Sequence, residues 1–158
     1  MRRLLFVSAL LGMVLFTSQG TRAQDPFAEH YIAGLKGLRS AHLVFGVAGK
    51  GPLNLKELAD FITVELARAL PGFKLIEDPK VPNWLKVSFI TTARGSYPTT
   101  LNVYRWVTLL DTKTDLLAVT WTRTLLDAGD RPESQASVKE ILQTLLTSFA
   151  ADYIKANR

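Results

Sequence analysis

Residues 101–125, LNVYRWVTLLDTKTDLLAVTWTRTL, decide the fold of this chain. Two apolar stretches, 101–110 and 116–125, contain many β-branched and aromatic residues, and they flank the polar segment 111–115. Two such runs joined by a few polar turn residues are typical of a β-hairpin. We therefore predict two long antiparallel strands, and the rest of the chain must complete the sheet and cover one of its faces.

Outside the hairpin, the spacing of apolar residues predicts further strands at 38–47, 73–77 and 85–90. Apolar side chains recur at helical spacing over 55–70, where Asn54 is the expected N-cap with Glu57 as its capping-box partner. A second helix is predicted over 134–156. The order β-α-β-β-β-β-α predicts an α+β fold: a two-layer sandwich in which two helices cover one face of a mixed, mostly antiparallel sheet of about five strands.

The N-terminal 23 residues have the pattern of a secretory signal peptide. Arg2 and Arg3 precede an apolar run over 4–16, which is shorter than the roughly 20 residues that a membrane-spanning helix needs. Small residues then lead to Ala23, after which we expect cleavage; cleavage after Gly20 and an uncleaved N-terminal anchor are the alternatives. The expected organisation is a signal peptide at 1–23, an irregular or short helical lead-in at 24–37 and a single α+β domain at 38–158.

The net charge of +5 belongs largely to this signal. Removing 1–23 takes away three arginines and no acid, which leaves sixteen basic residues against fourteen acidic ones. Because these cations form no run or stripe, we expect no nucleic-acid binding. The chain has no cysteine, which excludes disulfides, thiolate metal sites and a lipoprotein anchor. We therefore expect an exported protein, periplasmic or extracellular, with no transmembrane span after cleavage.

The glycine-rich turn around Lys50 lacks the spacing and the Ser or Thr of a phosphate-binding loop. Lys50 keeps a weaker interpretation as an anion contact, because it lies beside a predicted helix N-terminus. The two histidines, His30 and His42, have no metal-ligand spacing, and no Gly-x-Ser-x-Gly motif presents a nucleophile. We therefore predict no catalytic, metal or cofactor-binding residue, and a non-enzymatic protein.

The hairpin carries the most unusual side chains. If its turn centres on Lys113, Arg105 lies opposite Trp121, and Arg123 lies on the same, otherwise apolar face. Both arginines are candidate anion contacts.

On the opposite face the same register places Tyr104 opposite Thr122 and Trp106 opposite Thr120. If no helix covers this face, these four side chains form an exposed aromatic and threonine surface suited to a partner or a sugar. The alternative is a half-buried sheet with ordinary cross-strand packing.

Several short segments resemble a known group of proteins: 35–38 leading into 43–47, Gly72-Phe73, residues 120–122 and the closing stretch 149–157. Together they resemble a family of small bacterial proteins of unknown function that carry a signal peptide and one such domain. The resemblance implies export and carries no catalytic residue. In strand order the chain is also similar to accessory domains of the bacterial envelope that bind other envelope components.

The leading hypothesis is therefore a non-enzymatic binding or interaction module of the bacterial cell envelope, whose partner is another envelope protein or a polysaccharide. The alternative is a small-ligand carrier or hydrolase with a pocket between the C-terminal helix and the sheet, where Arg105 and Arg123 bind an anionic group.

Overall fold

The computed structural model describes residues 28–48, 53–90, 97–127 and 135–158. Lys50 and the predicted signal peptide lie outside these residues. The elements in chain order are α1 (Ala28–Ala33), β1 (Ser40–Ala48), α2 (Leu55–Ala69), β2 (Lys74–Leu75), β3 (Asn83–Ile90), β4 (Tyr97–Thr108), β5 (Asp115–Asp127) and α3 (Gln135–Ala156).

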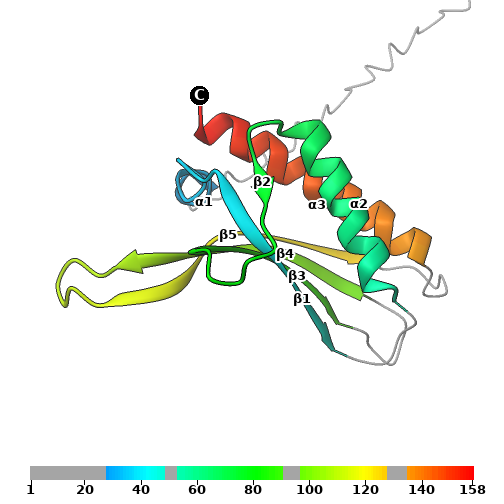
Figure 1. The fold of residues 1–158 in the computed structure, drawn as a ribbon, viewed down its shortest axis with the longest axis horizontal. Coiled ribbons are helices and arrows are strands. Elements are labelled where there is room, and N and C mark those ends of the chain that lie inside the picture. Colours follow the sequence, from blue (N-terminus) through cyan, green and yellow to red (C-terminus); the bar gives the residue numbers. More distant parts are fainter. Residues whose placement is uncertain (1–27, 49–52, 91–96, 128–134) are drawn as a thin grey trace, which may run out of the picture.

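The five strands form one open sheet in the order β2-β1-β3-β4-β5, and α2 and α3 lie side by side over one of its faces (Figure 1). β1 runs parallel to both β2 and β3, whereas β3, β4 and β5 are antiparallel. The predicted α+β fold with two helices on one face is confirmed. The short helix α1 lies within the stretch that was predicted as an irregular or short helical lead-in.

The core lies between the sheet and the two long helices. The alternation predicted for β3 is confirmed, because Leu85, Val87 and Phe89 are all buried. Trp121 of β5 is 1% exposed and meets Phe149 of α3 edge to face, with ring centroids 5.3 Å apart. Burying side chains of this size stabilises a fold by about 1.5–3 kcal/mol each.

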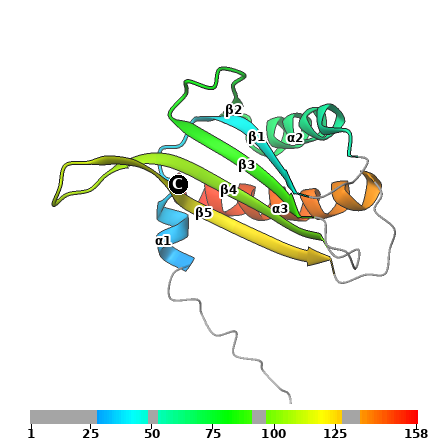
Figure 2. The same cartoon turned by 90° about the horizontal axis from the view of Figure 1, so that it is seen from below.

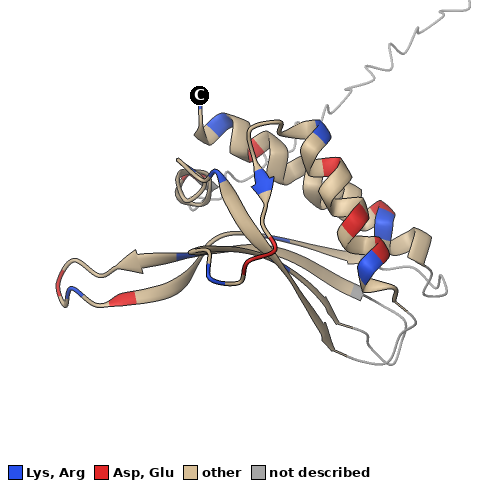
Figure 3. Ribbon diagram, viewed as in Figure 1, with Lys and Arg blue, Asp and Glu red and all other residues tan. Residues whose placement is uncertain are grey.

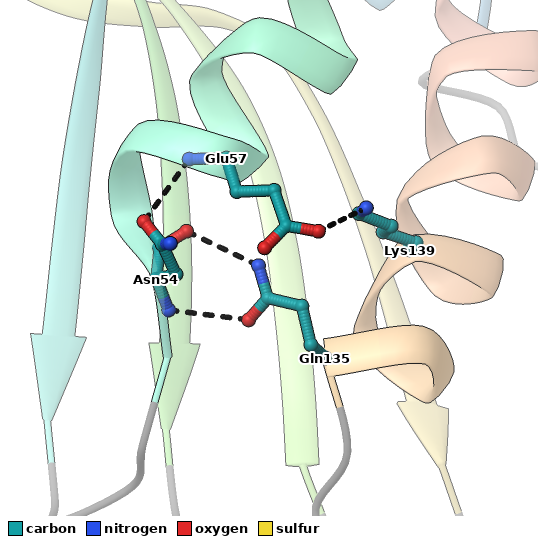
Figure 4. A network of polar contacts seen from close by, with 4 residues as sticks. All are labelled: Asn54, Glu57, Gln135 and Lys139. Atoms are coloured by element: carbon teal, nitrogen blue, oxygen red, sulfur yellow. Dashed lines mark hydrogen bonds and ion pairs between the residues drawn. The ribbon is translucent and has the colours of Figure 1, made fainter.

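The N-termini of α2 and α3 are joined by a polar network (Figure 4). Asn54 caps α2 as predicted, since its side-chain oxygen accepts the Glu57 amide at 3.2 Å. The other half of the predicted capping box is absent, because the Glu57 carboxylate accepts from Lys139 of α3. Gln135 takes the vacant place: its side-chain oxygen accepts the Asn54 amide, and its nitrogen donates to the Asn54 carbonyl. The cap therefore holds two helices together.

At the other end, the last turn of α3 holds the turn between α1 and β1. The Tyr153 hydroxyl donates to the Leu38 carbonyl at 2.7 Å. The Asn157 side chain donates to the Leu35 carbonyl at 3.1 Å and accepts the Gly37 amide at 2.8 Å. Gly37 has a φ of 71°, which glycine adopts without strain. These bonds attach the start of the described chain to its end.

The predicted hairpin exists, but its predicted register was wrong. Leu101 faces Arg123 and Arg105 faces Ala118, so the turn centres between Asp111 and Thr112 rather than on Lys113. A β-bulge between Val103 and Tyr104 adds a further shift of one residue. Since successive side chains of a strand point to opposite faces, this extra residue reverses which side chains of β5 face the helices.

Candidate functional site

The candidate site is the face of the sheet opposite α2 and α3, called here the outer face. Seen from below, this face lies in front of the two long helices, and no described helix crosses it (Figure 2). Trp84, Tyr104 and Val119 are cross-strand neighbours on three adjacent strands, and Trp106 lies opposite Leu117. We call these five residues the aromatic row.

The aromatic row is partly open to solvent. Trp106 is 57% exposed and Val119 is 44% exposed, whereas Trp84 and Tyr104 are half-buried. The Lys86 ammonium lies 6.0 Å from the centre of the Tyr104 ring, within the range of a weak cation–π contact. Trp106 also lies beyond the start of β3, where β4 and β5 continue as a projecting two-stranded arm (Figure 1). The row therefore offers rigid, amphipathic rings on an uncovered surface.

Three of the four predicted surface residues lie on the outer face, and the fourth does not. Tyr104, Trp106 and Thr122 lie there, although Thr122 faces Asn102 instead of Tyr104. Thr120 is the extra residue of the bulge, and its backbone and Cβ lie against Gly34 after α1. The prediction was wrong for Thr120 because the bulge turns it toward the helices. Val119 and Leu117 lie opposite Tyr104 and Trp106 in place of the two threonines.

The structure does not bring the predicted anion contacts together. Arg105 extends toward α1, where one guanidinium nitrogen donates to the carbonyls of Gly34 and Lys36 at 3.0 Å each. These bonds satisfy carbonyl groups at the C-terminal end of α1, so Arg105 has a structural role. Arg123 lies farther along β5, where it pairs with Asp152. Lys50 lies outside the described residues.

A hollow of about 360 Å³ surrounds Arg123 between α1, β5 and α3. Within it, Asp152 accepts a 3.0 Å hydrogen bond from the Trp121 indole nitrogen and lies 3.5 Å from the Arg123 guanidinium. The Arg123 side chain is 55% exposed, and the Asp152 side chain is 17% exposed. The Asp152 charge is thus partly neutralised, and Arg123 keeps donors directed at solvent. The hollow is lined by Tyr31, Ile32, Trp121, Thr122, Arg123, Thr124 and Asp152.

The histidines form no metal site within the described residues, where no group of three or more metal-binding side chains occurs. His30 is exposed on α1, and the Nδ1 atom of His42 lies 2.9 Å from the Ile76 carbonyl at the edge of the sheet. None of the described helices is long and apolar enough to cross a membrane.

Sequence reasoning missed Trp84, Leu117, Val119 and Asp152. Trp84 could have been found, because it precedes the alternating stretch 85–90 and therefore shares a face with Lys86. Leu117 and Val119 depend on the bulge, which has no signal in the sequence. Asp152 meets Trp121 from 31 residues away, a contact that no local pattern indicates.

No family model matches this chain, and no curated protein matches it. One solved structure with similarity, described as "Crystal structure of uncharacterized protein", has 12% sequence identity and a TM-score of 0.36. The match covers 74% of this chain and 90% of that chain. At this TM-score the similarity carries no argument, so the function has to be inferred from the side chains of the chain itself.

Proposed function

We propose that this protein is an exported, non-enzymatic interaction module of the bacterial cell envelope that engages its partner through the outer face of the sheet. The observation that carries this proposal is the aromatic row, whose exposed member Trp106 stands on a projecting arm. Clustered aromatic rings on an uncovered surface are typical of sites that bind proteins or sugars. The signal pattern in residues 1–23 supports export.

The aromatic row suits either another envelope protein or a polysaccharide. Tyrosine and tryptophan contribute large contact areas at a low cost in side-chain entropy, and they are enriched in the energetic centres of interfaces. Their flat faces also stack on sugar rings, while the outer-face Thr122 supplies a hydroxyl for hydrogen bonding.

The test removes the rings and leaves the fold intact. Proteins captured from an envelope extract, and binding to isolated cell-wall polysaccharide, are quantified for the unaltered chain and for the double variant Trp106→Ala, Tyr104→Ala. We expect the captured partner or the polysaccharide binding to be lost. The matched control is Val64→Ala, because Val64 is 56% exposed on α2 in the opposite layer. Identical capture by all three proteins would contradict the assignment.

The export part of the proposal has its own test. Expression of the full chain in a bacterium, followed by fractionation and N-terminal sequencing, should give a protein outside the cytoplasm that begins at Gln24. A protein that retains residues 1–23 would instead support the uncleaved anchor.

A second candidate function is a small-ligand carrier or hydrolase, and the hollow around Arg123 favours it. Of the two arginines predicted to bind an anion, Arg123 lines the hollow, together with Tyr31 and Asp152, and Arg105 does not. Native mass spectrometry should then reveal a co-purified small molecule, and an anionic ligand panel should raise the melting temperature of the unaltered chain but not that of Arg123→Ala. The absence of both effects would count against a carrier.

A further inference from the structure

The first strand of the sheet, β1, pairs with β2 at its first two residues and with β3 over the rest of its length. On one side β1 pairs with β3 from His42 to Ala48. On the other side β2 reaches only Ser40 and Ala41. Among the described residues, the sheet therefore has an edge along most of β1.

This pairing stops at a defined point. The Ile76 amide donates to the Ala41 carbonyl at 3.0 Å. The carbonyl of Ile76 itself lies 2.9 Å from the Nδ1 atom of His42. In a strand, the backbone N–H and C=O groups of every second residue point to the same side. Because the Ala41 carbonyl points toward β2, the backbone groups of Leu43, Phe45 and Val47 also point away from β3. Within the described parts of the chain, no strand pairs with these three residues on that side.

A hollow of about 310 Å³ adjoins this edge, between β1 and α2. In Figure 2, α2 runs beside β1 at the border of the sheet. The hollow has a mixed lining, in which apolar side chains lie together with polar and acidic ones. Its lining residues are His42, Leu43, Phe45, Ala59, Asp60, Thr63, Leu75, Ile76 and Glu77.

The charge at this hollow has one sign. Asp60 of α2 and Glu77, two residues after the end of β2, are both exposed, and neither forms an ion pair with another described residue. Figure 3 shows acidic positions on α2 and in the stretch that follows β2. The hollow therefore favours a cationic group over an anionic one.

We propose that the β1 edge and this hollow bind an extended peptide segment of a partner protein by β-strand addition. The peptide backbone pairs with Leu43, Phe45 and Val47, whose main-chain groups on this side have no strand partner among the described residues. Alternate apolar side chains of the peptide enter the hollow, and a lysine or arginine of the peptide lies against Asp60 and Glu77. This site is separate from the aromatic row, so it does not depend on the function proposed above.

The opposite edge of the sheet, β5, has protection against pairing with another strand, which the β1 edge lacks among the described residues. β5 carries a bulge at Thr120, and Gly34 lies directly against the backbone of that residue. Bulges and covering segments are common devices that protect an edge from unwanted pairing. The β1 stretch 43–48, LVFGVA, is apolar, uncharged and without such a device among the described residues. An edge of this kind is a liability unless a partner uses it.

A second copy of the chain is a poorer occupant than a basic peptide. Pairing of β1 with β1 across a two-fold axis would repeat the same acidic residues on both copies. The stretch 43–48 also offers no basic side chain to Asp60 or Glu77. Charge complementarity therefore favours a different partner.

The experiment selects ligands from a displayed library of random dodecapeptides with the purified protein. Enriched peptides should carry β-branched or aromatic residues at every second position and a lysine or arginine at one position. The best peptide is then synthesised, and its addition should shift the amide NMR signals of Leu43, Phe45 and Val47. Asp60→Lys should weaken its binding about tenfold or more, whereas Glu140→Lys, an exposed reversal on α3, should not.

Two further peptides test the backbone pairing without altering the protein. N-methylation of one set of alternate peptide amides should abolish binding, and N-methylation of the other set should leave it, because only one set faces β1. The proposal is overturned by a selection without enrichment, by equal loss with both methylated peptides, by unchanged binding to Asp60→Lys, or by shifts confined to the aromatic row. A dimer whose interface maps to β1 would likewise overturn the peptide in favour of a second copy.

Discussion

The indole nitrogen of Trp121 donates a 3.0 Å hydrogen bond to Asp152, which joins the edge strand β5 to the last turns of α3. Trp121 is the largest fully buried side chain of the described core, so its single polar atom needs a partner. The same carboxylate lies 3.5 Å from Arg123. Asp152 therefore accepts a hydrogen bond from a core residue and also pairs with the arginine that lines the adjoining hollow.

Removing this acceptor should destabilise the fold. Asp152→Ala leaves the buried indole N–H without a partner, which costs about 1–3 kcal/mol of unfolding free energy. Arg123→Ala is the control: its side chain is 55% exposed, and an exposed ion pair contributes about 0–1 kcal/mol. Urea unfolding of both variants measures the difference. Equal effects would mean that the indole bond contributes nothing.

Gly34 should not tolerate a larger residue. A Cβ atom at this position would lie 2.1 Å from the Thr120 carbonyl oxygen, so α1 would have to move away from β5. We expect Gly34→Ala to lower the melting temperature, with a loss of about 1–3 kcal/mol, which is the usual cost of overpacking. At Gly72 a Cβ meets no atom within 4 Å, so Gly72→Ala should differ from the unaltered chain by about 0.5 kcal/mol or less. A similar loss in both variants would contradict the close approach.

The hydroxyl of Tyr153 should contribute to the attachment of the β1 start. Tyr153→Phe removes the buried bond to the Leu38 carbonyl, at an expected cost of about 0.5–1.5 kcal/mol. Native-state hydrogen exchange should also show faster exchange of amides in residues 35–41, because this segment opens more easily. Tyr31→Phe is the comparison, since Tyr31 is 37% exposed. Unchanged exchange in Tyr153→Phe would exclude this role.

Thr99 should gain stability from losing its hydroxyl. Its side chain is fully buried on β4, and the hydroxyl has no hydrogen-bond partner among the described residues. A buried hydroxyl without a partner costs about 1–3 kcal/mol, so Thr99→Val should raise the melting temperature. Thr100→Val should not, because the Thr100 hydroxyl is shared with that of Thr124 at 3.0 Å. A destabilised Thr99→Val would show that the hydroxyl is satisfied.

Local patterns in the sequence were enough to predict the order of elements. The alternation of Leu85, Val87 and Phe89 reflects a strand with one buried face. Asn54 caps α2 because its side-chain oxygen accepts a hydrogen bond from the Glu57 amide, which has no partner within the helix. The placement of Tyr104 and Trp106 on one face of the sheet, opposite to that of Arg105, followed from the same period of two. These signals act over a few residues, so they can be found without the rest of the chain.

The register of the hairpin could not be found in this way. Any residue of the turn 111–115 could stand at its centre, and the bulge at Thr120 is associated with the approach of Gly34, a residue 86 positions earlier in the chain. Without the bulge, the pairing of Val103 with Trp121 would continue to Tyr104 opposite Thr120. The one extra residue in β5 places Val119 opposite Tyr104 instead.

The amino-acid sequence was sufficient for the α+β class, for the order of the strands and long helices, and for the common face of Tyr104 and Trp106, because each depends on local periodicity and capping. Three features required the folded chain: Arg105 binds the end of α1, Arg123 meets Asp152, and β2 pairs with only the first two residues of β1. Those features depend on contacts between residues distant in the chain, where packing, rather than residue pattern, selects the partner.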